Sequence, residues 1–93
     1  MIERSGDRVA VSGRVTVTEA ESLLEAGRKE ILPPKTLIDL GGITEADSSA
    51  LAVLFGWARE AAARNVQIEY LNAPANLLSL AEVYGVSDFL PRR

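Results

Sequence analysis

Two spacings of apolar residues recur along the chain, and each predicts a different kind of element. Short runs rich in β-branched and apolar residues predict strands at 2–4, 9–11, 36–40 and 66–71, and the β-rich residues 15–17 continue from the second run toward the first helix. Apolar residues three and four positions apart predict helices at about 18–31, 47–64 and 74–84. Because strands joined by helical segments of this length run parallel, we expect one α/β domain spanning residues 1–93. Its fold should be a mixed, mostly parallel sheet of about four to five strands, with three main helices packed on it.

Residues typical of helix ends support these bounds. Thr18 and Glu21 have the spacing of a capping box, which predicts the start of the first helix. Asp47 is a preferred N-cap residue and precedes the long helix. Gly85 stands where the third helix needs a left-handed residue to end it.

Apolar faces on the two later helices predict how they pack. The core face of the long helix should consist of Leu51, Leu54, Phe55, Ala58 and Ala62. That of the third helix should consist of Leu77, Leu80, Ala81 and Tyr84. A second apolar line on the long helix comprises Ala50, Val53 and Trp57. It either packs against a neighbouring helix or forms an exposed surface for a partner, since aromatic residues are enriched at interfaces.

Composition narrows the chemistry. The chain has no Cys and no His, so it lacks disulfides, a thiol nucleophile and the commonest general base. A net charge of −3 without a basic cluster argues against nucleic-acid binding. The longest apolar run, 50–58, is nine residues, against the ~20 that span a bilayer, and no segment resembles a signal peptide. We therefore expect a cytoplasmic, non-enzymatic protein that needs no cofactor and works by contact.

Candidate chemistry gathers where the strand at 36–40 gives way to the long helix, through an expected loop at 43–46. Open α/β sheets usually present their sites at this end of a strand. Gly41-Gly42 follows the strand, but no Gly-Lys-Ser/Thr comes after it, so a phosphate loop is not predicted. A catalytic Ser48 or Ser49 would need an adjacent base, and the chain has no His.

The acidic residues of this segment allow two further interpretations. Asp39, Glu45 and Asp47 would suit a hard cation, but their spacing does not match a dedicated cation loop, so no metal site is predicted. Asp47 is explained as a helix cap at the positive end of the helix dipole. Capping explains two consecutive serines less well, because serine is a poor residue inside a helix. Ser48 and Ser49 are therefore candidate contact residues.

These residues also carry a resemblance to a known family. Ile38-Asp39-Leu40 and the run from Ala46-Asp47-Ser48-Ser49 to Val53-Leu54 resemble the signature of the STAS domain, found in sulfate-transporter tails and anti-sigma-factor antagonists. The likeness extends over the whole chain in element order and length. The ending, Leu80-Ala81-Glu82-Val83-Tyr84-Gly85-Val86 with Leu90-Pro91-Arg92, resembles the small STAS subunit of the Mla phospholipid-transport ABC system.

The resemblance implies a function and a contact surface. It implies a non-catalytic subunit that binds the ATPase of an Mla-type ABC transporter, at the inner face of the inner membrane and in touch with it only through its partner. The alternative is an anti-sigma-factor antagonist that is switched when an anti-sigma factor serine kinase phosphorylates Ser48. Ser48 matches the phosphorylated serine of antagonists and the docking threonine of Mla-type subunits, while Ala50 replaces the usual glycine. The expected partner-binding residues are Asp47, Ser48, Ser49, Ala50, Val53 and Trp57.

Overall fold

The structure, a computed structural model, describes residues 1–90 and contains a four-stranded mixed sheet. Its strands, in order across the sheet, are β1 (Ile2–Ser5), β2 (Arg8–Val15), β3 (Lys35–Ala46) and β4 (Gln67–Leu71). β1 is antiparallel to β2, whereas β2, β3 and β4 run parallel. The expected mostly parallel α/β sheet is confirmed, with four strands because 9–11 and the start of 15–17 belong to one strand.

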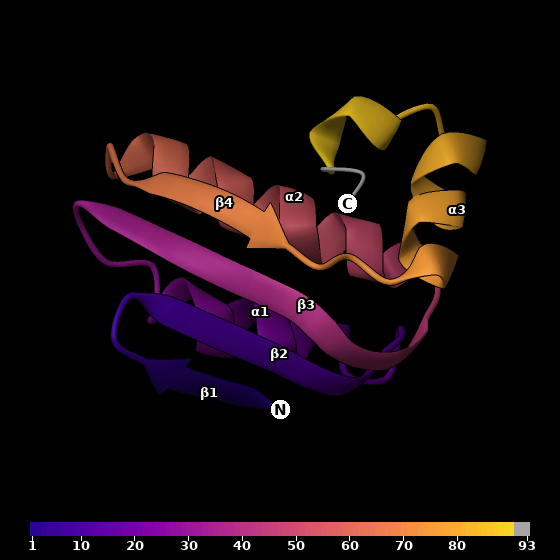
Figure 1. The fold of residues 1–93 in the computed structure, drawn as a ribbon, viewed down its shortest axis with the longest axis horizontal. Coiled ribbons are helices and arrows are strands. Elements are labelled where there is room, and N and C mark those ends of the chain that lie inside the picture. The colour runs from indigo at the N-terminus through magenta and orange to yellow at the C-terminus, as the bar shows by residue number, and fades with distance from the viewer. Residues whose placement is uncertain (91–93) are drawn as a thin grey trace.

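Helices cover one face of this sheet. The described chain forms α1 (Ala20–Arg28), α2 (Ser48–Ala63) and α3 (Ala75–Val83), followed by the short 3-10 turn η1 (Ser87–Phe89). α1 connects β2 to β3 and α2 connects β3 to β4, and because such crossovers are right-handed, both helices lie on the same face. Figure 1 shows α1 and α2 behind the sheet and α3 at one end of it. No helix of the described chain lies over the opposite face in this view.

β3 does not end at Gly41-Gly42, and the expected loop at 43–46 is wrong, because the strand continues through these residues. Gly42 pairs with Ser12 of β2 at a point where the register shifts. A Cβ at Gly42 would lie 2.9 Å from the Ser12 Cβ and 3.1 Å from the Val11 carbonyl oxygen. This glycine therefore permits the close approach of two strands and does not terminate one.

The start of α1 is also corrected by the structure. The helix begins at Ala20, with Glu19 as its N-cap residue, so Thr18 and Glu21 do not form the expected capping box. Instead Glu19 Oε1 accepts hydrogen bonds from the Thr16 backbone N–H at 2.9 Å and from the Thr16 hydroxyl at 2.6 Å. These bonds, the one from the hydroxyl foremost, hold the pKa of Glu19 below its ordinary value.

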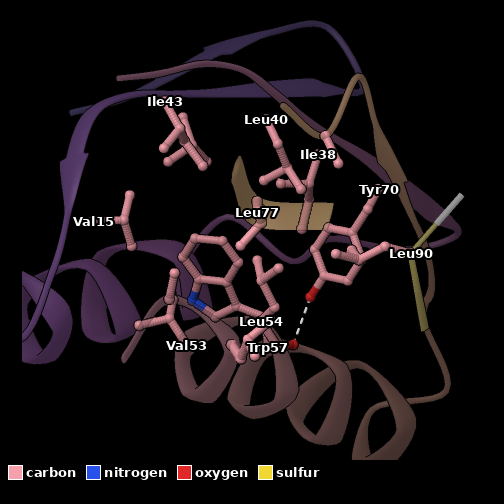
Figure 2. Packing of buried hydrophobic residues seen from close by; sticks show 14 of the residues in the cluster. Val15, Ile38, Leu40, Ile43, Val53, Leu54, Trp57, Tyr70, Leu77 and Leu90 are labelled. Atoms are coloured by element: carbon pink, nitrogen blue, oxygen red, sulfur yellow. Dashed lines mark hydrogen bonds between the residues drawn. The ribbon is translucent and has the colours of Figure 1, made fainter. Parts of the chain in front are cut away.

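The hydrophobic core fills the space between the helices and the sheet (Figure 2). The Tyr70 hydroxyl reaches from β4 across this layer and donates a hydrogen bond to the Leu54 carbonyl oxygen of α2 at 2.6 Å. Burial raises the pKa of Tyr70 well above its usual value, so the phenol stays neutral and keeps its proton for this bond. Leu90, at the end of the described chain, is buried in the same cluster.

The core face of α2 is wider than expected. Leu51 and Leu54 are buried as predicted, and Phe55 is half-buried. Ala62 is exposed, so its assignment to the core was wrong, and its neighbour Ala61 is buried instead. α2 packs against the sheet, α1 and α3, and these contacts bury more than one line of its residues.

Candidate interaction surface

Trp57 belongs to the core. Its side chain is 2% exposed, and the indole N–H donates a hydrogen bond to the Leu24 carbonyl oxygen of α1 at 3.1 Å. Ala50 and Val53 on the same line of α2 are each 1% exposed. The exposed contact surface expected from these three residues is therefore wrong, and the other interpretation of Trp57, packing against a neighbouring helix, is correct.

Asp47 caps α2 as predicted and also holds the preceding loop. Its Oδ1 accepts a hydrogen bond from the Ser49 backbone N–H at 2.8 Å, and its Oδ2 accepts one from the Val17 backbone N–H at 3.1 Å. Desolvation of the carboxyl opposes ionisation, but the N–H donors outweigh it and hold the pKa of Asp47 below its ordinary value. The carboxylate thus joins the segment after β2 to the start of α2.

Ser48 is the exposed member of the predicted set. It is the first residue of α2, and its side chain faces solvent, whereas Ser49 is half-buried and its N–H is occupied by Asp47. The predicted residues at the start of α2 are thus brought together at one end of the helix. The apolar residues predicted beside them point into the core.

An open apolar groove begins at Ser48. α2 contributes one wall and the chain around the end of α3 contributes the other, and the lining residues are Ser48, Leu51, Ala52, Phe55, Tyr84 and Val86. The hollow has a volume of about 350 Å³. Its surface is mostly hydrocarbon, and the hydroxyl groups of Ser48 and Tyr84 are its polar side-chain groups. The predicted contact residues Ala50, Val53 and Trp57 do not line this groove, whereas Leu51 and Phe55, which were predicted for the core, do.

Tyr84 is exposed, so its predicted place in the core of α3 is wrong. α3 buries Leu77 and Ala81, which lie one turn apart, whereas Tyr84 in the next turn is 58% exposed and Val83 is 79% exposed. Gly85 has the left-handed φ expected of it, +72°, and ends the helix there. The sequence did contain an indication of this exposed surface, because Val83 and Tyr84 directly precede Gly85, the predicted end of the helix. Side chains at the end of a helix have fewer core residues to pack against.

The groove offers contact surface and few reactive groups. Ser48 has no histidine anywhere in the chain to act as its base. Within residues 1–90, no cluster of acidic side chains is arranged to hold a metal ion. Asp39 accepts hydrogen bonds from the Gly41 N–H and Asn72, and Glu45 pairs with Arg14. In the same part of the chain, every helix is too short or too polar to cross a bilayer.

The fold is that of a STAS domain. An anti-sigma factor antagonist, SpoIIAA, in its unphosphorylated form matches 98% of this chain and 84% of its own, with a TM-score of 0.74 at 14% sequence identity. The sequence then defines the family more closely. The family model described as "Mlab, STAS domain" matches residues 1–91, so the chain belongs to the MlaB-type STAS family. The expected resemblance is confirmed, and STAS domains are generally regulatory or interaction modules.

Two structures of Mglu contain a partial match to the same fold. They share 23% and 19% sequence identity with this chain, cover 75% and 74% of it, and both have a TM-score of 0.58. The matched region is only 18% and 21% of the Mglu chains, so this likeness concerns the fold of one part of a longer protein. A comparison with curated proteins gives no sequence match.

Proposed function

We propose that this chain is a non-catalytic, cytoplasmic STAS subunit that binds the ATPase of an Mla-type ABC phospholipid transporter. It meets the inner face of the membrane only through that partner. The family match supports the proposal, and the observation that carries it is the open apolar groove that starts at the exposed Ser48. Exposed apolar surface rimmed by polar groups is typical of protein interaction sites.

The chain departs from the family pattern at Ala50, and this departure leaves the groove open. Ala50 stands where a glycine is usual in the resembling subunits, and an exposed methyl group there would crowd a docking partner. Ala50 is buried, however, so its methyl group points into the core and leaves the groove unobstructed. The exposed hydroxyl of Ser48 remains accessible to a partner at this end of α2.

The first prediction tests docking at Ser48. Ser48→Glu should leave the melting temperature nearly unchanged, because a negative charge is favoured at a helix N-terminus. It should weaken binding of the ATPase at least about tenfold, or ~1.4 kcal/mol, since a charge must be desolvated in an apolar interface. Ser48→Thr is the matched control and should bind like the parent, because it keeps the hydroxyl. Co-purification of each variant with the ATPase measures the effect.

One outcome would remove Ser48 from the interface. If Ser48→Glu binds the ATPase as tightly as the parent, the start of α2 is not the docking site. If the parent itself does not bind the ATPase, the proposed function is wrong.

A second candidate function rests on the exposure of the Ser48 hydroxyl. In this alternative the chain is an anti-sigma-factor antagonist, and an anti-sigma factor serine kinase phosphorylates Ser48. The fold of SpoIIAA and the accessible position of Ser48 at the helix start support it. Incubation of the chain with ATP and an anti-sigma kinase from the same organism, followed by mass spectrometry, tests it. Phosphate on Ser48, absent from Ser48→Ala, would favour the antagonist over the transporter subunit.

A further inference from the structure

We infer that the polar hollow between α1 and α2 binds a carboxylate group of the partner, with Arg59 as the main donor. This inference rests on the proposed function, because it specifies what the partner must present to this subunit. The hollow has a volume of about 250 Å³, and it is lined by Leu24 and Arg28 of α1 and by Gly56, Arg59 and Glu60 of α2. Two guanidinium groups therefore border one open space. A guanidinium suits a carboxylate, because its planar fork can donate two parallel hydrogen bonds to the two oxygens.

Arg59 has no partner of its own within the described chain. The other arginines of residues 1–90 each form an ion pair with at least one carboxylate: Arg4, Arg8, Arg14, Arg28 and Arg64. The Arg59 guanidinium forms no ion pair or hydrogen bond with any residue of that range, although acidic residues outnumber basic ones by 13 to 10 in the sequence. Its donors are thus available to a group from outside.

The acidic residues that contact the other arginines here are already engaged. Glu60 Oε2 accepts a hydrogen bond from Arg64 at 2.7 Å, and its Oε1 accepts one from Arg28 at 3.3 Å. Glu25 Oε2 accepts one from Arg28 at 3.1 Å. Together with Arg59, three positive and two negative side chains meet in this region, so one positive charge is not compensated.

This charge indicates which anion fits. One uncompensated positive charge matches a carboxylate, whereas a phosphate group brings nearly two negative charges and would be repelled more strongly by Glu25 and Glu60. An anionic membrane surface is recognised by clusters of roughly four or more basic residues, and this region does not provide them without neutralising acids. The hollow therefore favours the side chain of an Asp or Glu.

The position of Arg59 on α2 connects the hollow with Ser48. Ser48, Ala52 and Arg59 are exposed and stand at positions i, i+4 and i+11, which lie within about 40° of one another around the helix. Eleven residues of α-helix span roughly 16 Å, so a partner that lies along α2 from Ser48 reaches Arg59 about three turns later. The other charged residue of α2, Glu60, is held by arginines of this chain.

A docked partner would strengthen the contact. An ion pair between exposed side chains gains little in water, because solvent screens the two charges. When a partner covers the hollow and excludes water, the attraction between the same two charges increases, and it also steers association. The site therefore favours a carboxylate that belongs to a docked protein over a free anion.

Removal of the charge tests the inference with the ATPase as partner. Arg59→Gln should bind about fivefold more weakly than the parent at physiological salt, through loss of one partly covered ion pair. Its melting temperature should be unchanged, because the Arg59 guanidinium holds no other described residue. In 1 M salt, where charges are screened beyond about 3 Å, the affinities of the parent and Arg59→Gln should converge.

Lys29→Gln is the matched control. It removes the same charge from an exposed residue at the C-terminal cap of α1 that does not line the hollow. It should bind the ATPase within about twofold of the parent. Equal binding by Arg59→Gln and the parent, or equal weakening of the two variants, would overturn the inference. A weakening that persists undiminished in 1 M salt would overturn it as well, because a structural defect is not screened.

A titration with acetate separates this inference from the proposed function. Acetate supplies a carboxylate without a partner, and acetamide is a neutral control of similar shape. At constant ionic strength, acetate should shift the Nε–Hε NMR signal of Arg59 at least about twofold more than the signals of Arg4 and Arg64, whose Nε–H groups are engaged by glutamates. Acetamide should shift none of them.

This titration decides the question alone if the ATPase does not bind the parent. A selective shift of Arg59 would then mean that the carboxylate site is correct and only the identity of the partner is wrong. Equal shifts of the three arginine signals would refute the inference.

Discussion

At the scale of single residues, the contact between α1 and α2 depends on two glycines. Gly27 of α1 is buried against the indole of Trp57, and a Cβ at this position would overlap with the ring. The ring is held in place by its hydrogen bond to the Leu24 carbonyl oxygen. Gly56 of α2 faces Leu24 in turn, and a Cβ there would lie 2.6 Å from the end of that flexible side chain.

These two glycines should respond differently to the same substitution. Gly27→Ala should lower the free energy of unfolding by about 1–3 kcal/mol, because overpacking against a fixed ring exceeds the ~1 kcal/mol gained from helix propensity. Gly56→Ala is the matched control and should stay within about 1 kcal/mol of the parent, since Leu24 can rotate away. Urea titrations measure both. A Gly27→Ala variant as stable as the parent would mean that the helices can separate without cost.

The burial of Trp57 changes what its removal should do. Trp57→Ala should lower the free energy of unfolding by about 3–5 kcal/mol, because it leaves a cavity in the core. Leu54→Ala should lower it by a comparable amount, about 2–5 kcal/mol, for the same reason. Both side chains are 2% exposed, so neither is available for direct contact with a partner. Denaturant midpoints of the two variants check this. A Trp57→Ala variant that unfolds like the parent would contradict the packing between α1 and α2.

At the scale of elements, local chemistry was sufficient for some bounds. Asp47 caps α2, and Gly85 ends the third helix, because each acts through groups of its own or adjacent residues. The course of β3 depended on a residue distant in sequence. Gly42 continues the strand because Ser12 lies directly against it, and no pattern within residues 36–46 specifies that partner. The start of α1 depended on a local contact instead, because Glu19 is engaged by Thr16 three positions earlier, and the sequence analysis assigned this spacing to Thr18 and Glu21.

The site divides in the same way. The exposed serine at the start of α2 could be located from its own segment, because an N-cap fixes the first turn. The groove could not be located, since it needs Tyr84 from beyond the end of α3 and Phe55 from α2 on facing walls. Helical spacing assigned Tyr84 to the core, but the core ends one turn earlier at Ala81. Spacing gives the face of a helix and does not show how far the opposing surface extends.

At the scale of the whole molecule, four carboxyl groups make the free energy of unfolding depend on pH. The pKa values of Glu19, Asp39, Asp47 and Glu60 are all held below their ordinary values. The Gly41 N–H is the main cause for Asp39, and the hydrogen bond from Arg64 is the main cause for Glu60. Each group therefore binds its proton more weakly in the folded chain than in the unfolded chain.

Stability should accordingly fall as the solution is acidified. A carboxyl whose folded pKa is lowered contributes fully above the unfolded value, about 4, and loses this contribution as pH falls through the folded value. The urea midpoint should be nearly constant from pH 7 to about 5 and should decrease below about 4. Asp47→Asn keeps a capping oxygen but does not titrate, so its midpoint should decrease less on acidification. A midpoint that rises below pH 4 would contradict the assigned directions.

The pairing of β3 with β2 has a consequence for the thermodynamics of binding. β4 pairs with β3 only as far as Asp39, whereas β2 stays paired with it up to its last residue, Ala46, which lies opposite Val15. Ser48 follows two residues later, beyond a carboxylate anchored to the Val17 N–H. The backbone at the head of the groove is thus ordered before any partner arrives. A partner that docks there finds a preorganised surface, and most of the conformational entropy lost on association must come from the partner's own segment.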